Sequence, residues 1–208
     1  GLGVEIGRLD AAGTVVRGRG LDGWRSPDRP LDCGNSGTTT RLLLGALAGC
    51  RLEARLTGDA SLLGRPMRRV TEPLRAAGAA FDELGDPDRL PLRVRGKHPL
   101  DAIHHDSPRA SAQVKSALLL AGLTGASSVR VSEPWLSRDH TERMLRSMGV
   151  RLETVVQSGR PTVALEPTDR LDPLDVAIPG DPSSAAFFLG LGALRAPVRT
   201  PGVLLNPT

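Results

Sequence analysis

The chain has 208 residues, of which 39% are hydrophobic and 24% charged, proportions that indicate a globular protein and exclude a disordered one. Its longest apolar runs, such as 42–44 and 118–120, are too short to cross a bilayer, so no membrane partner is expected. The net charge of +4, carried almost wholly by arginine, favours anionic ligands or reflects codon usage, while an aromatic content of 2% argues against nucleic acid as a partner.

The chain opens with two short strand-like runs, 4–6 and 14–17, which we interpret as the end of an earlier structural unit. It has no initiator methionine, and we expect it to be an excerpt of a longer protein. Cys33 and Cys50 give no disulfide or metal framework and fit buried thiols in a reducing compartment. A cytoplasmic location is therefore predicted, and we expect a monomer.

Three stretches along the chain share one pattern, a small polar cap followed by an apolar helix rich in alanine and glycine. These caps lie near Asn35, Ser111 and Ser183, at similar intervals. Because the helices are apolar all round, we expect them to be buried, with sheets packed about them.

Each of the first two repeats also has a second helix with a polar face, expected over 65–77 and over 139–148. Both end at a glycine, Gly78 or Gly149, as helix C-termini often do. Strand-like runs follow the helices at 51–56, 80–84, 92–94, 128–131, 150–156 and 162–165. The predicted fold class is therefore α/β, built from repeated β-α-β-α-β-β units with buried helices, and a further unit begins near Leu174.

The segment 34–41 begins with Gly34 and Gly37, which let a ligand approach the backbone closely. The helix that follows points its free N–H groups and its positive dipole end at that ligand. Arg65 precedes Pro66, where the next helix is expected to begin, and an arginine there can reach an anion. Taken alone, the first segment also fits an ordinary helix cap, and Arg65 also fits a solvated surface residue.

The second repeat has the same arrangement. Ser111 and Gln113 stand at the start of a buried helix, where a hydroxyl and an amide can bind a charged oxygen, although a serine cap with a solvated glutamine fits as well. Arg138 has the place in its repeat that Arg65 has in the earlier one. Two arginines at equivalent positions, each beside a capped helix, indicate one composite anion site.

Other polar residues are expected to have structural or surface roles. Asp139 is the expected cap of the second helix in its repeat, and His140 and Glu142, in the first turn, are expected to be surface groups. His104 and His105 are adjacent on a strand and point to opposite faces, so they do not predict a metal site.

Five ordered motifs give the chain a resemblance to a known family. They are LDCGNSGT at 31–38, GDASLLGRPM at 58–67, SAQVKSA at 111–117, SRDHTE at 137–142 and PGDPSSA at 179–185. Together they resemble the signatures of 5-enolpyruvylshikimate-3-phosphate synthase. That family folds as two similar domains of three such units, with substrates between them. The resemblance implies that residues 1–177 are most of one enolpyruvyl transferase-like domain and that 178–208 begin the second.

The resemblance also implies a reaction and its ligands. The enolpyruvyl group of phosphoenolpyruvate is transferred to shikimate 3-phosphate with release of phosphate, a step towards aromatic amino acids that needs no cofactor. Both substrates are polyanions, so the site requires many cationic and N–H donors. The implied substrate-binding residues are Asn35, Gly37, Arg65, Ser111, Ala112, Gln113 and Arg138. The resemblance assigns contacts with shikimate 3-phosphate to Ser111, Ala112, Gln113 and Arg138. It assigns contacts with phosphoenolpyruvate to Gly37, Arg65 and Gln113, with Asn35 beside them, and the small Gly37 implies room there for the phosphonate glyphosate.

The family's catalytic groups are expected outside this sequence. A Lys-Ser-Arg cluster would lie ahead of Gly1, and catalytic Asp, Lys and Glu residues beyond Thr208. No pair of residues in the chain is a candidate for general acid–base work, so no catalytic residue is predicted and the chain alone is expected to be inactive.

Three alternatives stay open. UDP-N-acetylglucosamine enolpyruvyl transferase shares the fold but uses a cysteine on a glycine-rich loop, a context that Cys33 and Cys50 lack. RNA 3′-terminal phosphate cyclase has related repeats, but scarce aromatic residues argue against it. The third alternative is a fragment that binds ligands without catalysis.

Overall fold

The computed structural model describes residues 1–11 and 13–204. The chain divides into two compact units, Gly1–Leu171 and Asp172–Thr208, and the last four residues of the second lie outside the described part. The predicted α/β class is confirmed, because the first unit contains two complete β-α-β-α-β-β repeats. No helix among the described residues is long and apolar enough to span a bilayer.

The first repeat forms a four-stranded mixed sheet. Its strands, in spatial order, are β3 (Leu31–Asp32), β4 (Glu53–Thr57), β6 (Leu92–Arg95) and β5 (Ala80–Glu83). The first pair is parallel and the other two pairs are antiparallel. The helices of this repeat are α1 (Gly37–Ala48), the short α2 (Ala60–Leu63) and α3 (Arg68–Ala76).

The second repeat has the same topology. Its strands, in spatial order, are β7 (Ile103–Asp106), β8 (Val129–Ser132), β10 (Arg160–Leu165) and β9 (Leu152–Gln157). Again the first pair is parallel and the others are antiparallel. Its helices are α4 (Ala112–Thr124) and α5 (His140–Ser147). Gly78 and Gly149, after α3 and α5, have positive φ values of 98° and 81°, which glycine adopts without strain.

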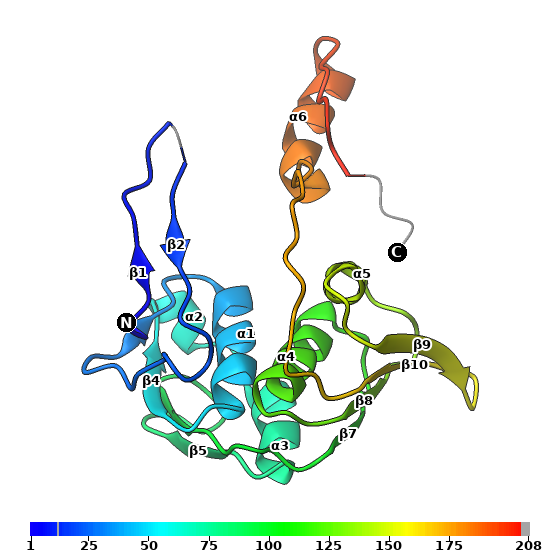
Figure 1. The fold of residues 1–208 in the computed structure, drawn as a ribbon. Coiled ribbons are helices and arrows are strands. Elements are labelled where there is room, and N and C mark those ends of the chain that lie inside the picture. Colours follow the sequence, from blue (N-terminus) through cyan, green and yellow to red (C-terminus); the bar gives the residue numbers. More distant parts are fainter. Residues whose placement is uncertain (12, 205–208) are drawn as a thin grey trace. The chain divides into compact units, whose positions relative to one another are not determined.

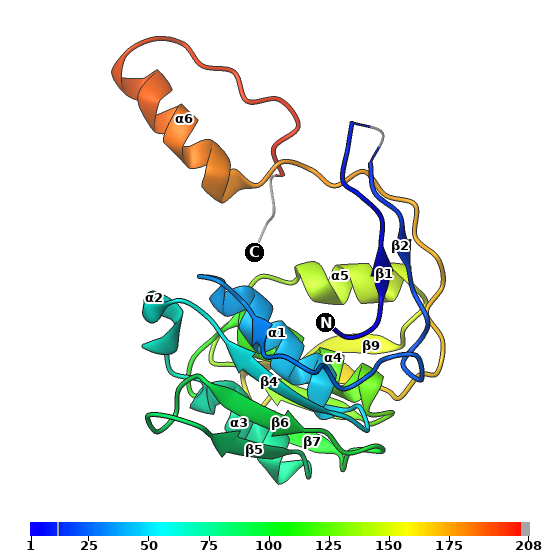
Figure 2. The ribbon, with the colours of Figure 1, turned by 90° about the vertical axis from the view of Figure 1, so that its left-hand side faces the viewer.

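The helices α1 and α4 lie side by side in the middle of this unit, as Figures 1 and 2 show. The expectation that they are buried is confirmed, since Leu44 and Leu47 of α1 and Leu118 and Leu119 of α4 are fully buried. Their close approach depends on Gly45, where an added Cβ would lie 2.1 Å from the backbone oxygen of Ala117. The contact therefore brings the N-terminal turns of both helices to neighbouring positions.

A histidine joins the C-terminal ends of the two central helices. His98 Nδ1 lies 3.1 Å from the oxygen of Gly49, the C-cap of α1, and 3.0 Å from the oxygen of Thr124, the last residue of α4. Both partners accept hydrogen bonds, so Nδ1 carries a proton and donates to carbonyls that the helices leave free. The two helices are thus tied at their C-terminal ends as well as along their contact.

The helix predicted to begin at Pro66 begins at Arg68. The carboxylate of Asp88 accepts hydrogen bonds from the backbone N–H groups of Met67 and Arg68, and so it caps α3 in place of a residue of the chain's own turn. The short α2 was not predicted, although Asp59 is a typical cap residue and caps it by accepting from Leu62 N at 2.8 Å.

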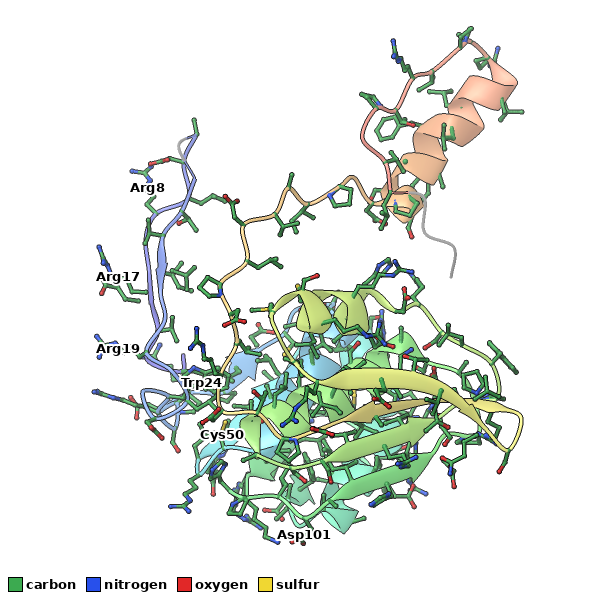
Figure 3. The ribbon with its side chains drawn as sticks, turned by 45° about the vertical axis from the view of Figure 1, so that its right-hand side comes forward. Arg8, Arg17, Arg19, Trp24, Cys50 and Asp101 are labelled. Carbon is green, nitrogen blue, oxygen red and sulfur yellow. The ribbon has the colours of Figure 1, made fainter. Side chains whose placement is uncertain are left out.

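Two parts of the chain are less covered than the central repeats. β1 (Glu5–Ile6) and β2 (Val16–Arg17) form an exposed hairpin, shown in Figure 3 with the side chains of Arg8 and Arg17 labelled. In the second unit, α6 (Pro182–Leu194) is capped by Asp181, two residues before the Ser183 near which the cap was predicted. The expectation that α6 is buried is wrong, because most of its large apolar side chains are exposed. The described residues of the second unit form no sheet that could cover them.

Candidate anion-binding site

The N-terminal turn of α1 is a capped helix start, which we call the mouth of α1. Ser36 is the cap, and its Oγ accepts from Thr39 N at 3.1 Å. Gly34 has a φ of +55°, and its N–H donates to Asp32 Oδ1 at 2.8 Å. The glycines and the cap therefore make a tight turn ahead of the helix, whose capped start was predicted from the sequence.

Asn35 and Arg65 meet beside this mouth. Arg65 Nη2 donates to Asn35 Oδ1 at 2.8 Å, and Asn35 Nδ2 donates to Asp59 Oδ2 at 2.6 Å. Hydrogen bonds from the backbone of Leu62 and from Asn35 lower the pKa of Asp59, which favours the charged carboxylate. The carboxylate accepts the hydrogen bond that orients the amide of Asn35. The amide in turn orients the guanidinium of Arg65.

Arg41, in the first half of α1, connects this group to Gln113 at the start of α4, and the sequence analysis did not identify it as a site residue. Its Nη1 donates to Gln113 Oε1 at 2.9 Å and to Gly37 O at 3.3 Å, and its Nη2 donates to Pro66 O at 3.3 Å. Arg41 is the one charged residue within the apolar sequence of α1, a signal that would have identified it. Burial is the main reason that the pKa of Arg41 is lowered, and repulsion from Arg65 and Arg69 adds to it.

The positive charges of Arg41, Arg65 and Arg69 favour an anion among them. Guanidinium groups that destabilise one another gain stability when an anion lies among them. Such perturbed groups cluster at functional sites, and arginine forks suit phosphate and carboxylate oxygens. The neighbourhood of Arg41 and Arg65 is therefore a candidate site for an anion.

Gln113 connects this group to a hollow between the mouths of α1 and α4. Its Nε2 donates to Thr38 Oγ1 at 2.7 Å, so the two helix starts are bridged by one side chain. The hollow has a volume of about 240 Å³ and is lined by Thr38, Leu42, Ala112, Gln113, Ser116, Arg138, His140 and Thr141. We refer to this set of residues as the hollow.

The structure thus brings most of the predicted residues together. Ala112, Gln113 and Arg138 line the hollow, while Asn35, Gly37 and Arg65 form the adjoining group that Arg41 links to Gln113. Ser111 does not line the hollow. It caps α4, where its Oγ accepts from Val114 N at 3.5 Å.

Two predictions about the start of α5 need correction. Glu142 was expected at the surface, but it is 1% exposed, because Lys115 lies 2.6 Å away and supplies a buried counter-charge. Asp139 occupies the cap position of α5 without a capping bond, since its Oδ2 accepts from Arg143 Nε at 2.9 Å instead. His140 is exposed, as expected, but it also lines the hollow.

The remaining candidates give no further site. Cys33 and Cys50 are free and buried, as predicted, and burial raises the pKa of the Cys50 thiol to about 11. Among residues 1–11 and 13–204, no group of three or more His, Cys, Asp or Glu side chains is arranged to hold a metal ion.

Repeated β-α-β-α-β-β units with amide and guanidinium donors at the helix mouths define an α/β protein with a candidate site for small anions. The chain belongs to the EPSP synthase (3-phosphoshikimate 1-carboxyvinyltransferase) family, which it matches over residues 1–208. The predicted family resemblance is confirmed by this match.

Individual relatives agree with the family match. The chain is 50% identical over 209 residues to the 3-phosphoshikimate 1-carboxyvinyltransferase of Desulfitobacterium hafniense (strain DSM 10664 / DCB-2), covering 100% of this chain and 47% of that protein. It is 48% identical to that of Bacillus licheniformis, with the same coverage. A solved EPSP synthase from Acinetobacter baumannii superposes with a TM-score of 0.79 at 40% identity, covering 90% of this chain and 41% of that one. The chain therefore spans about half the length of these relatives.

Proposed function

We propose that this chain is part of a transferase that moves the enolpyruvyl group from phosphoenolpyruvate to shikimate 3-phosphate and releases phosphate. The observation that carries the proposal is the meeting of Gln113 and Arg138 at one hollow, in a chain that matches the family throughout. The two relatives compared above are named 3-phosphoshikimate 1-carboxyvinyltransferase, after this reaction. Donors fixed in advance of ligand binding are what two polyanionic substrates require.

In this proposal the residues of the hollow bind shikimate 3-phosphate. Arg138 offers an exposed guanidinium for bidentate contact with phosphate, and Gln113 offers an amide next to the mouth of α4. Ser111 contributes as the cap that sets the position of Ala112. These groups bind and orient the substrate, so that its hydroxyl adds to the enol carbon as the methylene group is protonated. Phosphate then leaves as the new methyl group loses a proton, which restores the double bond of the enolpyruvyl ether.

The adjoining group would hold phosphoenolpyruvate. Arg65 and Arg41 supply positive charge, Asn35 keeps Arg65 in place, and Gly37 leaves open the space between the two guanidinium groups. Gln113 bonds with Arg41 and lies at the border of both regions, so it is assigned to both substrates.

Replacing Arg138 by alanine tests the proposal. We expect the KM for shikimate 3-phosphate to rise about 100-fold, because one charge-assisted bidentate contact, about 2–3 kcal/mol, is lost. Phosphate release from both substrates, together with calorimetric titration of shikimate 3-phosphate, gives the measurement in the intact protein. Arg130→Ala is the control, since Arg130 on β8 pairs with Gln157 on β9 of the same sheet, does not line the hollow, and should leave the KM unchanged. Equal effects of the two substitutions would refute the assignment of Arg138.

Replacing Gly37 by alanine should raise the KM for phosphoenolpyruvate about tenfold, or about 1.4 kcal/mol. The added Cβ would lie 2.7 Å from Arg41 Nη1 and 3.2 Å from Arg65 Nη1, so both guanidinium groups must shift. If glyphosate uses the same slot, its inhibition constant should rise with the KM. Inhibition of the unsubstituted enzyme by millimolar glyphosate is the result to obtain first, and its absence would remove glyphosate from the proposal.

The same proposal includes several further assignments. Residues 1–177 would be most of one domain and 178–208 the start of a second, in a cytoplasmic monomer that binds no nucleic acid. The 208-residue chain alone would bind ligand without turnover. Turnover of UDP-N-acetylglucosamine, or cyclisation of RNA 3′-phosphates, by the intact protein would favour the two alternative enzymes instead.

A further inference from the structure

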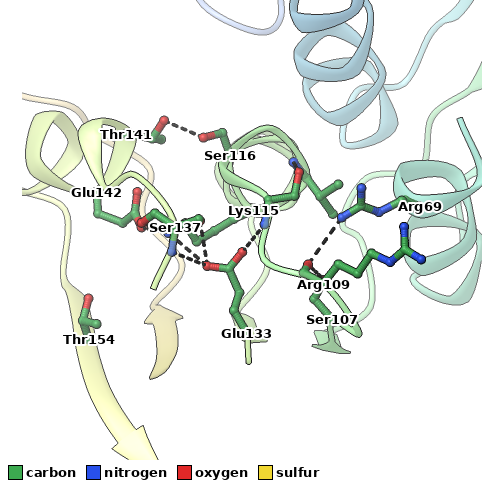
Figure 4. Close-up of polar contacts among 12 residues, drawn as sticks. Arg69, Ser107, Arg109, Lys115, Ser116, Glu133, Ser137, Thr141, Glu142 and Thr154 are labelled. Carbon is green, nitrogen blue, oxygen red and sulfur yellow. Dashed lines mark hydrogen bonds and ion pairs between the residues drawn. The ribbon is translucent and has the colours of Figure 1, made fainter. Parts of the chain in front are cut away.

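A buried group of charged side chains neighbours the hollow, and Figure 4 shows its contacts. Lys115 Nζ lies 2.6 Å from Glu142 Oε1 and 3.3 Å from Glu133 Oε2, and it donates to Ser137 O at 3.2 Å. The three charged side chains are at most 3% exposed. A buried ion group is seldom more stabilising than apolar side chains of the same volume, so its advantage is better sought in the geometry that it fixes.

Glu133, which follows β8, joins the two segments that carry the proposed ligands of shikimate 3-phosphate. Its Oε1 accepts from the backbone N–H of Ser111 at 2.7 Å. Its Oε2 accepts from Ser137 Oγ at 2.7 Å and from Ser137 N at 3.3 Å. Ser111 caps the helix that carries Gln113, and Ser137 directly precedes Arg138. One carboxylate therefore ties the mouth of α4 to the loop that carries Arg138.

Glu142 has the same chemistry and burial but lacks this connection. Its carboxylate pairs with the Lys115 ammonium, and apart from Lys115 no hydrogen-bond partner is found for either oxygen among the described residues. It lies in the first turn of α5, where the helix dipole favours a negative charge. Glu142 thus balances the charge of Lys115, whereas Glu133 makes the tie between segments.

We infer that Glu133 is a positioning residue, which holds Gln113 and Arg138 at the spacing that a phosphorylated substrate needs. Glu133 does not line the hollow, so it acts on the ligand only through Ser111 and Ser137. The identity of the ligand rests on the proposed function, but the tie between the two segments does not. Loss of the tie should weaken substrate binding more than it slows the bond-making step.

The test compares Glu133→Gln with Glu142→Gln in the intact protein. A glutamine at 133 can accept from one N–H group, but its own NH₂ faces the other donor, so one half of the tie breaks. We expect Glu133→Gln to raise the KM for shikimate 3-phosphate about tenfold or more while kcat changes less than about threefold. Glu142→Gln should leave that KM within about twofold, because no segment carrying a ligand loses a bond.

A second readout is independent of catalysis. Lys115 faces the oxygen that accepts from Ser137, so the glutamine oxygen should stay there and its NH₂ should face the Ser111 N–H. Amide hydrogen exchange in peptides that span Ser111 should therefore be about tenfold faster in Glu133→Gln and unchanged in Glu142→Gln. If the glutamine variant does not fold, Glu133→Asp, which keeps the charge but shortens the reach, should give the same direction in both readouts.

The outcomes separate the two claims. Equal KM values and equal exchange in the two glutamine variants would overturn the positioning role. A protein that fails to use shikimate 3-phosphate before any substitution would refute the proposed function, and the exchange comparison would still decide whether Glu133 makes the tie.

Discussion

Replacing Lys115 by methionine should lower the free energy of unfolding by about 3–5 kcal/mol. Methionine has a similar length and suits an apolar interior, so the cost comes from the charges that it leaves behind. Glu133 and Glu142 would lie 3% and 1% exposed with no cation between them. Ser137 O would also lose its donor. Urea unfolding of the intact protein, followed by circular dichroism, measures the loss.

Lys97 is a matched control, because it is the only other lysine of the chain. It pairs with Asp101 at 2.7 Å, but both side chains are largely exposed. An exposed pair of this kind contributes less than about 1 kcal/mol, so Lys97→Met should have a small effect. A second comparison is Lys115→Met with Glu142→Gln, which should recover part of the loss by removing one uncompensated charge. Equal losses for the two lysine substitutions would contradict the account.

Replacing Gly45 by alanine should lower the free energy of unfolding by about 3 kcal/mol, the upper end of the usual cost of overpacking. The added Cβ would lie 2.1 Å from the oxygen and 2.7 Å from the carbonyl carbon of Ala117. These are backbone atoms of α4, so no side chain can turn away and the two central helices must separate. Thermal unfolding should show a lower melting temperature, by about 2–4 °C for each kcal/mol lost.

The same substitution should also reach the hollow. Separation of α1 from α4 pulls Thr38 away from Gln113, so the KM values for both substrates should rise with the loss of stability. Gly190→Ala is the control, since Gly190 is also helical but an added Cβ meets nothing within 4 Å. Alanine is the better helix former by about 1 kcal/mol, so this control should be neutral or stabilising. A Gly45 variant as stable as the control would show that the close helix contact is wrong.

The repeat topology was predictable from sequence because neighbouring residues mark where its helices begin and end. Small polar caps at Ser36 and Ser111 mark the starts of two helices that have no polar face. Helices of this kind must be buried, and here sheets cover them. The glycines after α3 and α5 mark helix ends through their backbone conformation alone. Such signals need no knowledge of distant residues.

The errors arose where a residue's environment depends on a distant partner. Glu142 reads as a surface group because its burial requires Lys115 from another helix. The start of α3 depends on Asp88, twenty residues further along the chain, which supplies the cap that the local turn lacks. Arg41 was passed over because its role depends on Gln113 and Pro66. Isolated charged residues inside apolar helices, as with Arg41 and Lys115, were the signal that deserved more weight.

The central claim is that the mouths of α1 and α4, together with Arg138, form one place for a phosphorylated substrate. A crystal structure of the intact protein with shikimate 3-phosphate tests it most directly. We expect ligand oxygens within hydrogen-bond distance of both Gln113 and Arg138. A ligand bound elsewhere, with neither side chain in contact, would contradict it.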